Sequence, residues 1–509
     1  MSAPSSPARR PTATRVVAVA SAVAVAGVAV VRNRQARRET AADAAAALVG
    51  PLGATGRSHR SLVTARAATR AGRGWAMHRA RRTFADAGRR EELDLEHQIR
   101  TATEVAETLG NLKGAMMKLG QMASFLHQGM PEPVRDALAQ LQQDAPPMAP
   151  ELAAGVIAAE LGQAPEELFA EWDPIPIASA SIGQVHRAVT RDGRAVAVKV
   201  QYPGVDAAIR ADLDNSDLLF GAMGMLFSGL DPAPLVAELR DRLLEELDYR
   251  NEAENQQRFV DYFGGHPTIS VPEVLHELST GRVLCTELAY GAKWTDVLEW
   301  SQEERNLTAE TLYRFAFGGI YRLGVFNGDP HPGNYLFRPG GEVTFLDFGL
   351  CKVFTPDEIA EFQRLITAMV LHQDPVEVRR VWSEAGVLVD DPKLSDELIH
   401  EYFSHFFEMV LKDETMAITS EYASDSLRRF FDLSGPYAEV MKSVTLPSFM
   451  VVIQRINLGL YALFGELRAV ANWRRLAEEV WPFVDRCPTT PMGEASRRWE
   501  IERGYRSAE

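Results

Sequence analysis

The stretch "VFNGDPHPGNYLFRPGGEVTFLDFGL" (325–350) decides the fold, because three of its polar residues are spaced for one kind of chemistry. Asp329 and Asn334 are five residues apart, and Asp347 follows Asn334 by thirteen. Phosphoryl transfer needs a carboxylate that positions the attacking hydroxyl and oxygen ligands that hold Mg²⁺. We therefore expect Asp329 to be catalytic, and Asn334 and Asp347 to bind the metal. His331, between two prolines, is expected mainly to fix the shape of this loop.

A second stretch, "SIGQVHRAVTRDGRAVAVKVQ" (181–201), predicts two strands joined by a tight turn at Asp192 and Gly193. A run of small residues precedes these strands, and small residues let backbone N–H groups approach phosphate oxygens. We expect Lys199 to contact the phosphates of ATP and Glu252, on the following helix, to pair with Lys199. The residues predicted to contact the nucleotide are Ala178, Ser179, Ala180, Ser181, Ile182, Gly183, Gln184, Lys199 and Glu287.

The order of loop, lysine, helix glutamate, Asp/Asn pair and DFG predicts a protein-kinase-like fold. Three features depart from ordinary protein kinases, and one is a nucleotide loop richer in Ala and Ser than in Gly. The triplet Asn327-Gly328-Asp329 lacks the arginine that grips a phosphorylated activation loop. Only five residues separate DFG from Thr355, the predicted start of the next helix, which leaves little platform for a protein substrate. These departures favour a small-molecule or lipid-like substrate.

At this point the chain resembles the UbiB/AarF family of atypical kinases. The resemblance covers roughly residues 95–465 and is specific, because a KxGQ motif upstream and an ExD motif inside the small lobe are not general to kinases. The residues that carry it are the "KLGQ" motif with Lys118 and Gln121, the Ala-rich loop 178–184, Lys199, Glu246 and Asp248 of "ELD", Glu252, "DPHPGN" and "DFG".

The resemblance implies roles for residues that the pattern alone would leave as ordinary surface positions. Lys118 and Gln121 would come from a helical extension that packs over the active site, and Lys118 would meet Glu246 of the ExD motif. Lys118, Gln121, Glu246 and Asp248 are therefore added to the predicted catalytic residues. Members of the family are linked to isoprenoid lipid and quinone metabolism, often at membranes. They are better supported as ATPases or small-molecule kinases than as protein kinases, and the Ala-rich loop is associated with altered nucleotide preference.

The predicted architecture is α+β: a two-lobed protein-kinase-like fold with a small strand-rich N-lobe, a helical C-lobe and an N-terminal helical extension over the active site. The predicted segments are a basic leader (1–38), an Ala/Arg-rich linker (39–94), the KxGQ extension (95–165), the N-lobe (166–291), the C-lobe (292–485) and a polar tail (486–509). Helices are expected at about 234–257 and 309–324. A further helix is expected to begin at a capping box at Thr355, and the segment 447–465 is expected to be a buried helix of the C-lobe.

Charge is unevenly distributed along the 509 residues, whose formal net charge is −15. Residues 1–90 hold 17 Arg, no Lys and three acidic residues. A basic segment on an acidic body favours an anionic membrane surface as partner, whereas no aromatic residues alternate with the basic ones as nucleic-acid binding would need. The three cysteines show no metal-binding or disulfide pattern, which fits a reducing cytoplasm.

An apolar run at residues 16–31 is flanked by Arg15 and Arg32. Sixteen residues of helix span roughly 24 Å, short of the roughly 30 Å hydrocarbon core. The run is compatible with a short membrane anchor, an uncleaved signal-like segment, a helix lying on the surface, or a poorly ordered Ala/Arg leader. We expect the protein at the cytoplasmic face of a membrane, or in the cytoplasm if the run does not insert.

The sequence thus predicts an ATP- and Mg²⁺-dependent phosphotransferase or ATPase that acts at a membrane on a small-molecule or lipid substrate, without nucleic acid. Two alternatives stay open: a pseudokinase-type adaptor that binds nucleotide without turnover, and a soluble small-molecule phosphotransferase. The pattern sets no oligomeric state.

Overall fold

The structure is a computed structural model that describes residues 148–180, 182–214, 244–328, 330–389, 391–431, 437–444 and 448–507. Contacts divide the chain into two units, the larger spanning 147–202 and 244–509. The other unit spans 1–146 and 203–243, and its described part holds helix α9 (Val205–Asp214). The predictions for Lys118, Gln121 and the apolar run 16–31 lie outside the described residues.

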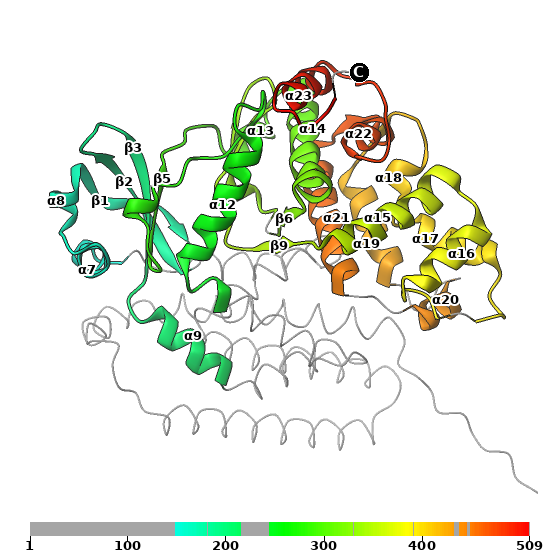
Figure 1. Ribbon diagram of the computed structural model, residues 1–509, viewed down its shortest axis with the longest axis horizontal. Helices are drawn as coiled ribbons and strands as arrows, with labels where there is room; N and C mark the ends of the chain where they lie inside the picture. Colours follow the sequence, from blue (N-terminus) through cyan, green and yellow to red (C-terminus); the bar gives the residue numbers. More distant parts are fainter. Residues whose placement is uncertain are drawn as a thin grey trace, which may run out of the picture. The chain divides into compact units, whose positions relative to one another are not determined.

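Four antiparallel strands form the N-lobe sheet in the order β1-β2-β3-β5 (Figure 1). They are β1 (Phe169–Ala180), β2 (Gly183–Thr190), β3 (Ala195–Gln201) and β5 (Val283–Glu287). The predicted turn between β2 and β3 is confirmed, and Gly193 has a φ of 89° there, which suits a residue without Cβ.

One face of this sheet is covered by helix α7 (Pro150–Leu161), which is followed by α8 (Pro165–Leu168). Alternate residues of β3, Val196, Val198 and Val200, are fully buried and share a hydrophobic cluster with Ile157 of α7. Burying an aliphatic side chain of this size contributes roughly 1.5–3 kcal/mol. Helix α7, which was expected in the KxGQ extension, therefore packs as part of the N-lobe.

Helix α12 (Tyr249–Phe263) starts later than the sequence suggested. A continuous helix over 234–257 was predicted, but Asp248 has an extended backbone and its carboxylate accepts a hydrogen bond from the Arg250 N–H. This is the arrangement of an N-cap, so a new helix begins at Tyr249. The prediction of one unbroken helix is wrong at this position.

Short strands lie between the helices of the C-lobe, and β6 and β9 are labelled in Figure 1. Two small sheets have the orders β4-β8-β7 and β6-β9, and a third pairs β10 with β11. The strands are β4 (Ile269–Ser270), β6 (Val325–Asn327), β7 (Tyr335–Arg338), β8 (Glu342–Phe345), β9 (Cys351–Val353), β10 (Met416–Ala417) and β11 (Val470–Ala471). Strands β7 and β8 form an antiparallel hairpin that closes at the pair of Arg338 and Glu342.

Helices make up most of the C-lobe. The α-helices are α13 (Trp294–Val297), α14 (Gln302–Gly318), α15 (Pro356–Ile366), α16 (Pro375–Glu384), α17 (Asp396–Ser404), α18 (Glu408–Leu411), α19 (Ser420–Phe431), α20 (Ala438–Ser443), α21 (Ser448–Leu467), α22 (Trp473–Val480) and α23 (Pro491–Glu502). Short 3₁₀ segments are His276–Leu278 and Pro332–Asn334, and π-helical turns are Gly319–Leu323 and Thr367–His372.

Two helix starts were predicted from local sequence, one correctly and one too late in the chain. The capping box at α15 is confirmed, because the Thr355 hydroxyl accepts from the Glu358 N–H and the Glu358 carboxylate accepts from the Thr355 N–H. Helix α14, expected from 309, begins at Gln302 because Ser301 caps it by accepting from the Glu304 N–H. A polar first turn concealed this start.

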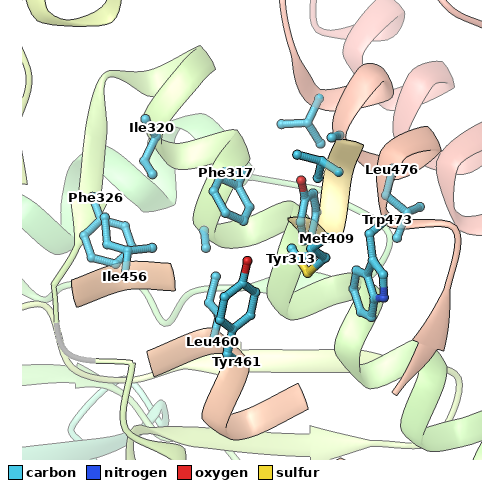
Figure 2. Packing of buried hydrophobic residues seen from close by; sticks show 14 of the residues in the cluster. Tyr313, Phe317, Ile320, Phe326, Met409, Ile456, Leu460, Tyr461, Trp473 and Leu476 are labelled. Atoms are coloured by element: carbon cyan, nitrogen blue, oxygen red, sulfur yellow. The ribbon is translucent and has the colours of Figure 1, made fainter. Parts of the chain in front are cut away.

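The C-lobe core joins α14, α21 and α22 through large aromatic residues (Figure 2). Tyr313 and Phe317 lie on α14, and Leu460 and Trp473 on α21 and α22 pack with them. Helix α21 confirms the predicted buried helix at 447–465, and its Phe464 is fully buried. None of the helices in the described part of the chain has both the length and the apolar character of a membrane span.

The predicted polar tail, 486–509, is instead largely structured. It contains α23, whose Met492 and Trp499 are buried against the C-lobe. Thr490 caps this helix by accepting from the Gly493 N–H, and Pro491 occupies its first position. The polar residues that suggested a tail lie on the solvent side of an amphipathic helix.

Candidate functional site

Three charged side chains from three separate elements meet beside the N-lobe sheet. Lys199 of β3 places its Nζ 2.7 Å from Oε1 and 2.9 Å from Oε2 of Glu252 on α12. The same Nζ lies 3.5 Å from Oδ2 of Asp347, the aspartate of DFG. The predicted pairing of Lys199 with Glu252 is therefore present, and Asp347 completes a cluster of one cation and two carboxylates.

The environment of Lys199 keeps its amine charged. Burial opposes the positive charge, but the carboxylates of Asp347 and Glu252 outweigh that effect and raise the pKa of Lys199 well above its ordinary value. The ring of Tyr249 lies under the amine, with 5.0 Å between Nζ and the ring centroid. The lysine is thus a fixed cation at pH 7, and its side chain retains 15% exposure.

Glu252 is the most deeply buried member of the cluster. Its side chain is 5% exposed, against 15% for Lys199 and 32% for Asp347. Burial raises the pKa of Glu252 to about 7, Lys199 acts in the opposite direction, and Asp347 adds to the rise. Lys199 and Asp347 are the members of the cluster with more solvent contact, and they are therefore the ones a ligand can reach.

Backbone contacts hold Asp347 in place. Its Oδ1 accepts from the Gly349 N–H at 3.0 Å, and its carbonyl oxygen accepts from the Asn327 side chain at 2.6 Å. The Leu346 N–H donates to the carbonyl oxygen of Asn334 at 2.9 Å, so the two predicted metal-binding residues lie on adjoining backbone segments. Asp329 lies outside the described residues, and its role stays a prediction.

His331 shapes the loop that carries Asn334. Its Nδ1 accepts from the Gly333 N–H at 3.1 Å and caps the 3₁₀ turn Pro332–Asn334. This is the loop-shaping role expected from the flanking prolines. The loop geometry is therefore set without a ligand on this nitrogen.

The Ala-rich loop turns between β1 and β2, close to Lys199. Ala178, Val185 and Lys199 are directly paired across the three strands, so their side chains share one face of the sheet. Ala178 and Ser179 are exposed, Ala180 is half-buried, Ile182 is buried, and Ser181 lies outside the described residues. Ala178 therefore lines the face that Lys199 occupies. Ser179 pairs with Gln184 and lies on the opposite face, so its predicted contact with the nucleotide is not supported by the strand register.

Gly183 has a packing role at the base of this loop. A Cβ at this position would overlap the carbonyl oxygen of Val200 and lie 2.9 Å from the Tyr249 hydroxyl. The hairpin therefore sits against β3 more closely than any residue with a side chain allows. The glycine lets the loop approach both Lys199's strand and α12.

Gln184 does not face the nucleotide side, contrary to the prediction. It is fully buried on the opposite face, where its Oε1 accepts from the Met148 N–H at 2.8 Å. Its Nε2 lies 2.9 Å from Nε2 of His186, whose Nδ1 lies 2.9 Å from the carbonyl oxygen of Asp173. A neutral His186 with the proton on Nδ1 satisfies all three contacts. Gln184 therefore anchors the segment before α7 to the sheet.

Glu287 also departs from its predicted role. It pairs with Val196, three residues before Lys199 on β3, and this odd separation places the Glu287 side chain on the opposite face of the sheet. Glu287 is also one of the residues that line a cavity of about 350 Å³, together with His266, Glu273 and Arg338. Only the backbone of Glu287 is placed to contribute to a ligand beside Lys199.

The two acidic residues of the ExD motif have different roles: Asp248 caps a helix, and Glu246 places a charge near Glu252. Asp248, predicted as catalytic, caps the helix that carries Glu252 and makes an exposed ion pair with Arg250 at 3.7 Å. Glu246 is buried, and its charge contributes to the raised pKa of Glu252 after the effects of burial, Lys199 and Asp347. Its predicted contact with Lys118 involves a residue outside the described part of the chain.

Two residues of the site were missed from sequence. Tyr249 lies under Lys199, and its buried hydroxyl has no hydrogen-bond partner among the described residues. Asn327 holds the backbone of Asp347 from the neighbouring strand β6. Asn327 was noticed only as part of the triplet that lacks an arginine, whereas the ring of Tyr249 after ExD gave no signal of contact with an amine.

Comparison with known proteins agrees with this geometry. Residues 140–381 match the family model described as the ABC1 atypical kinase-like domain. The chain belongs to this family of atypical kinase-like proteins, which confirms the resemblance to the UbiB/AarF kinases and the two-lobed α+β fold.

Individual relatives are similar over part of their length. The chain is 31% identical to the atypical kinase COQ8, mitochondrial, of Saccharomyces cerevisiae, over 52% of this chain and 54% of that protein. It is 30% identical to the probable protein kinase UbiB of Marinobacter nauticus, over 60% of this chain and 58% of that protein. The chain thus spans about half the length of these relatives.

A solved structure is similar over its full length. The Mycobacterium tuberculosis protein Rv3197, determined in complex with erythromycin, is 30% identical with a TM-score of 0.57. The similarity covers 78% of this chain and 100% of that chain.

Proposed function

We propose that the chain binds Mg²⁺ and ATP and transfers or hydrolyses the terminal phosphoryl group. The contact between Lys199, Glu252 and Asp347 carries this proposal, because three elements distant in sequence converge on one partly exposed cluster. Membership of a family whose members are named as kinases supports the same conclusion.

The residues present fit such a ligand. Lys199 supplies a fixed positive charge for phosphate oxygens, Asp347 and Asn334 supply the oxygen ligands that Mg²⁺ prefers, and the small residues of 178–180 leave the sheet face open. The buried Tyr249 hydroxyl is a further donor beside the loop. When bound, the magnesium nucleotide would supply the phosphoryl group. Asp329 would orient the attacking hydroxyl or water.

The proposed substrate is a small molecule or lipid of isoprenoid or quinone metabolism, reached at the cytoplasmic face of a membrane. The names of relatives support the family context, and the Arg-rich residues 1–90 support an anionic surface. Turnover by the full chain should rise with anionic liposomes, not with neutral ones, and the rise should fall as salt screens the charge. Equal turnover under all these conditions would remove the membrane part of the proposal.

Asp347→Asn tests the nucleotide site directly. The neutral amide removes the charge that holds the metal, so we expect the wild-type protein to gain thermal stability with ATP and Mg²⁺ and the variant to gain little. Asp357→Asn, an exposed position at the start of α15, is the matched control and should keep the shift. No shift in the wild type would refute nucleotide binding. Binding without turnover, with cellular function retained in Asp329→Asn, would favour the adaptor alternative.

A macrolide is a second candidate ligand, because the relative that this chain covers in full was solved with erythromycin. Calorimetric titration of the full chain with erythromycin, with and without the magnesium nucleotide, tests it. Heat of binding that saturates at one site would support a macrolide-class ligand, and none would restrict that property to the relative.

A further inference from the structure

Helix α12 carries Glu252 near its first turn, so the position of this helix decides whether Glu252 reaches Lys199. The N-terminal end of α12 is held by the Tyr249 N–H, which donates to the carbonyl oxygen of Gly281 at 2.9 Å. Its middle is held by Asn255, whose side chain donates to the carbonyl oxygen of Phe348 at 3.2 Å. The C-terminal end, at Phe263, needs a separate support.

That support comes from α23, more than 220 residues later in the chain. The Trp499 indole N–H donates to the carbonyl oxygen of Gly264 at 3.1 Å, and its ring stacks on Phe263 with centroids 6.2 Å apart. The Arg503 guanidinium donates to the carbonyl oxygen of Asp261 at 2.5 Å. These contacts reach the last turn of α12, where the carbonyl groups have no partner within the helix.

Beyond α23, Tyr505 extends the same contact. Its ring stacks on Tyr262 with centroids 4.8 Å apart and planes 11° from parallel. The guanidinium of Arg503 lies over the Tyr505 ring at 5.7 Å from its centroid. Two partly exposed side chains therefore secure the outer side of the α12 terminus, and both can be changed without opening the core.

The other end of α23 is fixed in the C-lobe. The Thr490 hydroxyl donates to Oε1 of Glu310 at 2.6 Å, and Glu310 pairs with Arg314 at 2.7 Å. A Cβ on Gly493 would overlap the Glu479 carboxylate and lie 2.7 Å from the Arg314 guanidinium. Helix α23 therefore packs closely against α14 and α22 at its N-terminal end. At its C-terminal end it contacts the end of α12 (Figure 1).

We propose that α23 is a positioning element for the nucleotide site: it holds α12 so that Glu252 stays against Lys199. The inference rests on the proposed nucleotide binding, and it assigns a role to residues beyond the 140–381 segment that matches the kinase-like domain. Arg503 and Tyr505 act through α12 and do not touch the nucleotide.

The test uses the full chain with the double variant Arg503→Ala/Tyr505→Ala. Arg498→Ala is the matched control, because it removes the same charge from an exposed position of α23. Hydrogen exchange of the protein alone should show faster exchange at 255–263 in the double variant and wild-type exchange in the control. Unchanged exchange at 255–263 would overturn the proposal.

A cycle with Glu252→Gln separates positioning from general stability. In the wild-type background the double variant should weaken binding of ADP and Mg²⁺ by about threefold or more, and in the Glu252→Gln background by less than about twofold. Equal weakening in both backgrounds would mean that α23 only stabilises the fold. If the wild-type protein binds no nucleotide, the proposed function fails, while the exchange experiment still decides whether α23 holds α12.

Discussion

Two clusters in this protein have the same charges but differ in how far they are open to solvent. Each has one cation between two carboxylates: Lys199 with Glu252 and Asp347, and Arg314 with Glu310 and Glu479. The side chains around Arg314 are no more than 8% exposed. Asp347, by contrast, is 32% exposed and lies on the loop after β8.

The difference lies in what surrounds the charges. Around Arg314, the hydroxyl of Thr489 donates to Glu479 at 2.9 Å and that of Thr490 to Glu310 at 2.6 Å, so the protein itself supplies the additional partners. The Lys199 cluster instead opens to solvent at Asp347. A closed cluster stabilises the fold, and an open one is suited to a ligand, although both would look alike in a count of ion pairs.

The largest effect on stability is expected for Arg314→Met. It leaves two carboxylates buried without their cation, and such a change typically costs about 3–5 kcal/mol in the free energy of unfolding. Arg364 is the matched control, since it also contacts two carboxylates, Glu361 and Glu384, but at the surface. Arg364→Met should cost less than about 1 kcal/mol in denaturant unfolding. Similar losses in the two variants would contradict the distinction.

A smaller effect on stability is expected from His266, which follows α12 and whose ring meets that of Trp499 on α23 edge to face, with centroids 4.7 Å apart. Burial and the charge of Arg314 lower the pKa of His266 to about 3, and its Nδ1 accepts from the Thr268 and Ile269 N–H groups. Since the unfolded chain binds the proton near pH 6.5 and the folded chain does not, stability is fully present above pH 6.5 and declines below it.

Chemical denaturation at pH 7.5 and pH 5.5 measures this effect. The wild type should lose about 1 kcal/mol more than His266→Asn between the two pH values, because the partly buried ring resists protonation and asparagine does not titrate. At pH 7.5 the histidine is neutral in both states, so that pH serves as the reference. Parallel pH dependence of the two proteins would show that His266 protonates freely in the fold.

The smallest change in stability is expected for Lys199→Met, despite the burial of the lysine. Asp347 remains partly solvated, and Glu252, whose pKa is already about 7, can take up a proton. We expect the free energy of unfolding to change by about 1 kcal/mol or less, while binding of the magnesium nucleotide is lost. A loss as large as that of Arg314→Met would show that the Lys199 cluster is structural after all.

The sequence predicted the parts of the site that depend on motif and order. The turn at Gly193 and the capping box at Thr355 follow from short patterns with a direct physical cause, whereas the pairing of Lys199 with Glu252 followed from the kinase-like order of the motifs. The approach of Asp347 to Lys199 depends on the whole fold, and it followed only from the similarity of the order to kinases.

The errors have equally specific causes. Gln184 and Glu287 were assigned by proximity to the loop and strand end, but strand alternation places both on the face opposite Lys199. This could have been found, because Gln184 is out of phase with the apolar Val185 that pairs with Lys199. The Thr-Pro pair at 490 and 491 is the same signal used correctly at Thr355, and it would have predicted α23.

Gly183 has a consequence for any attempt to alter the loop by selection. Because the Val200 carbonyl oxygen and the Tyr249 hydroxyl leave no room for a Cβ, a library randomised over 178–183 and selected for folding alone would return glycine at 183. Exposed position 178, on the face of Lys199, would accept many residues under that selection and fewer residues only when nucleotide use is also demanded. Selection at position 183 would therefore test whether the fold forms, and selection at position 178 would test whether the nucleotide is used.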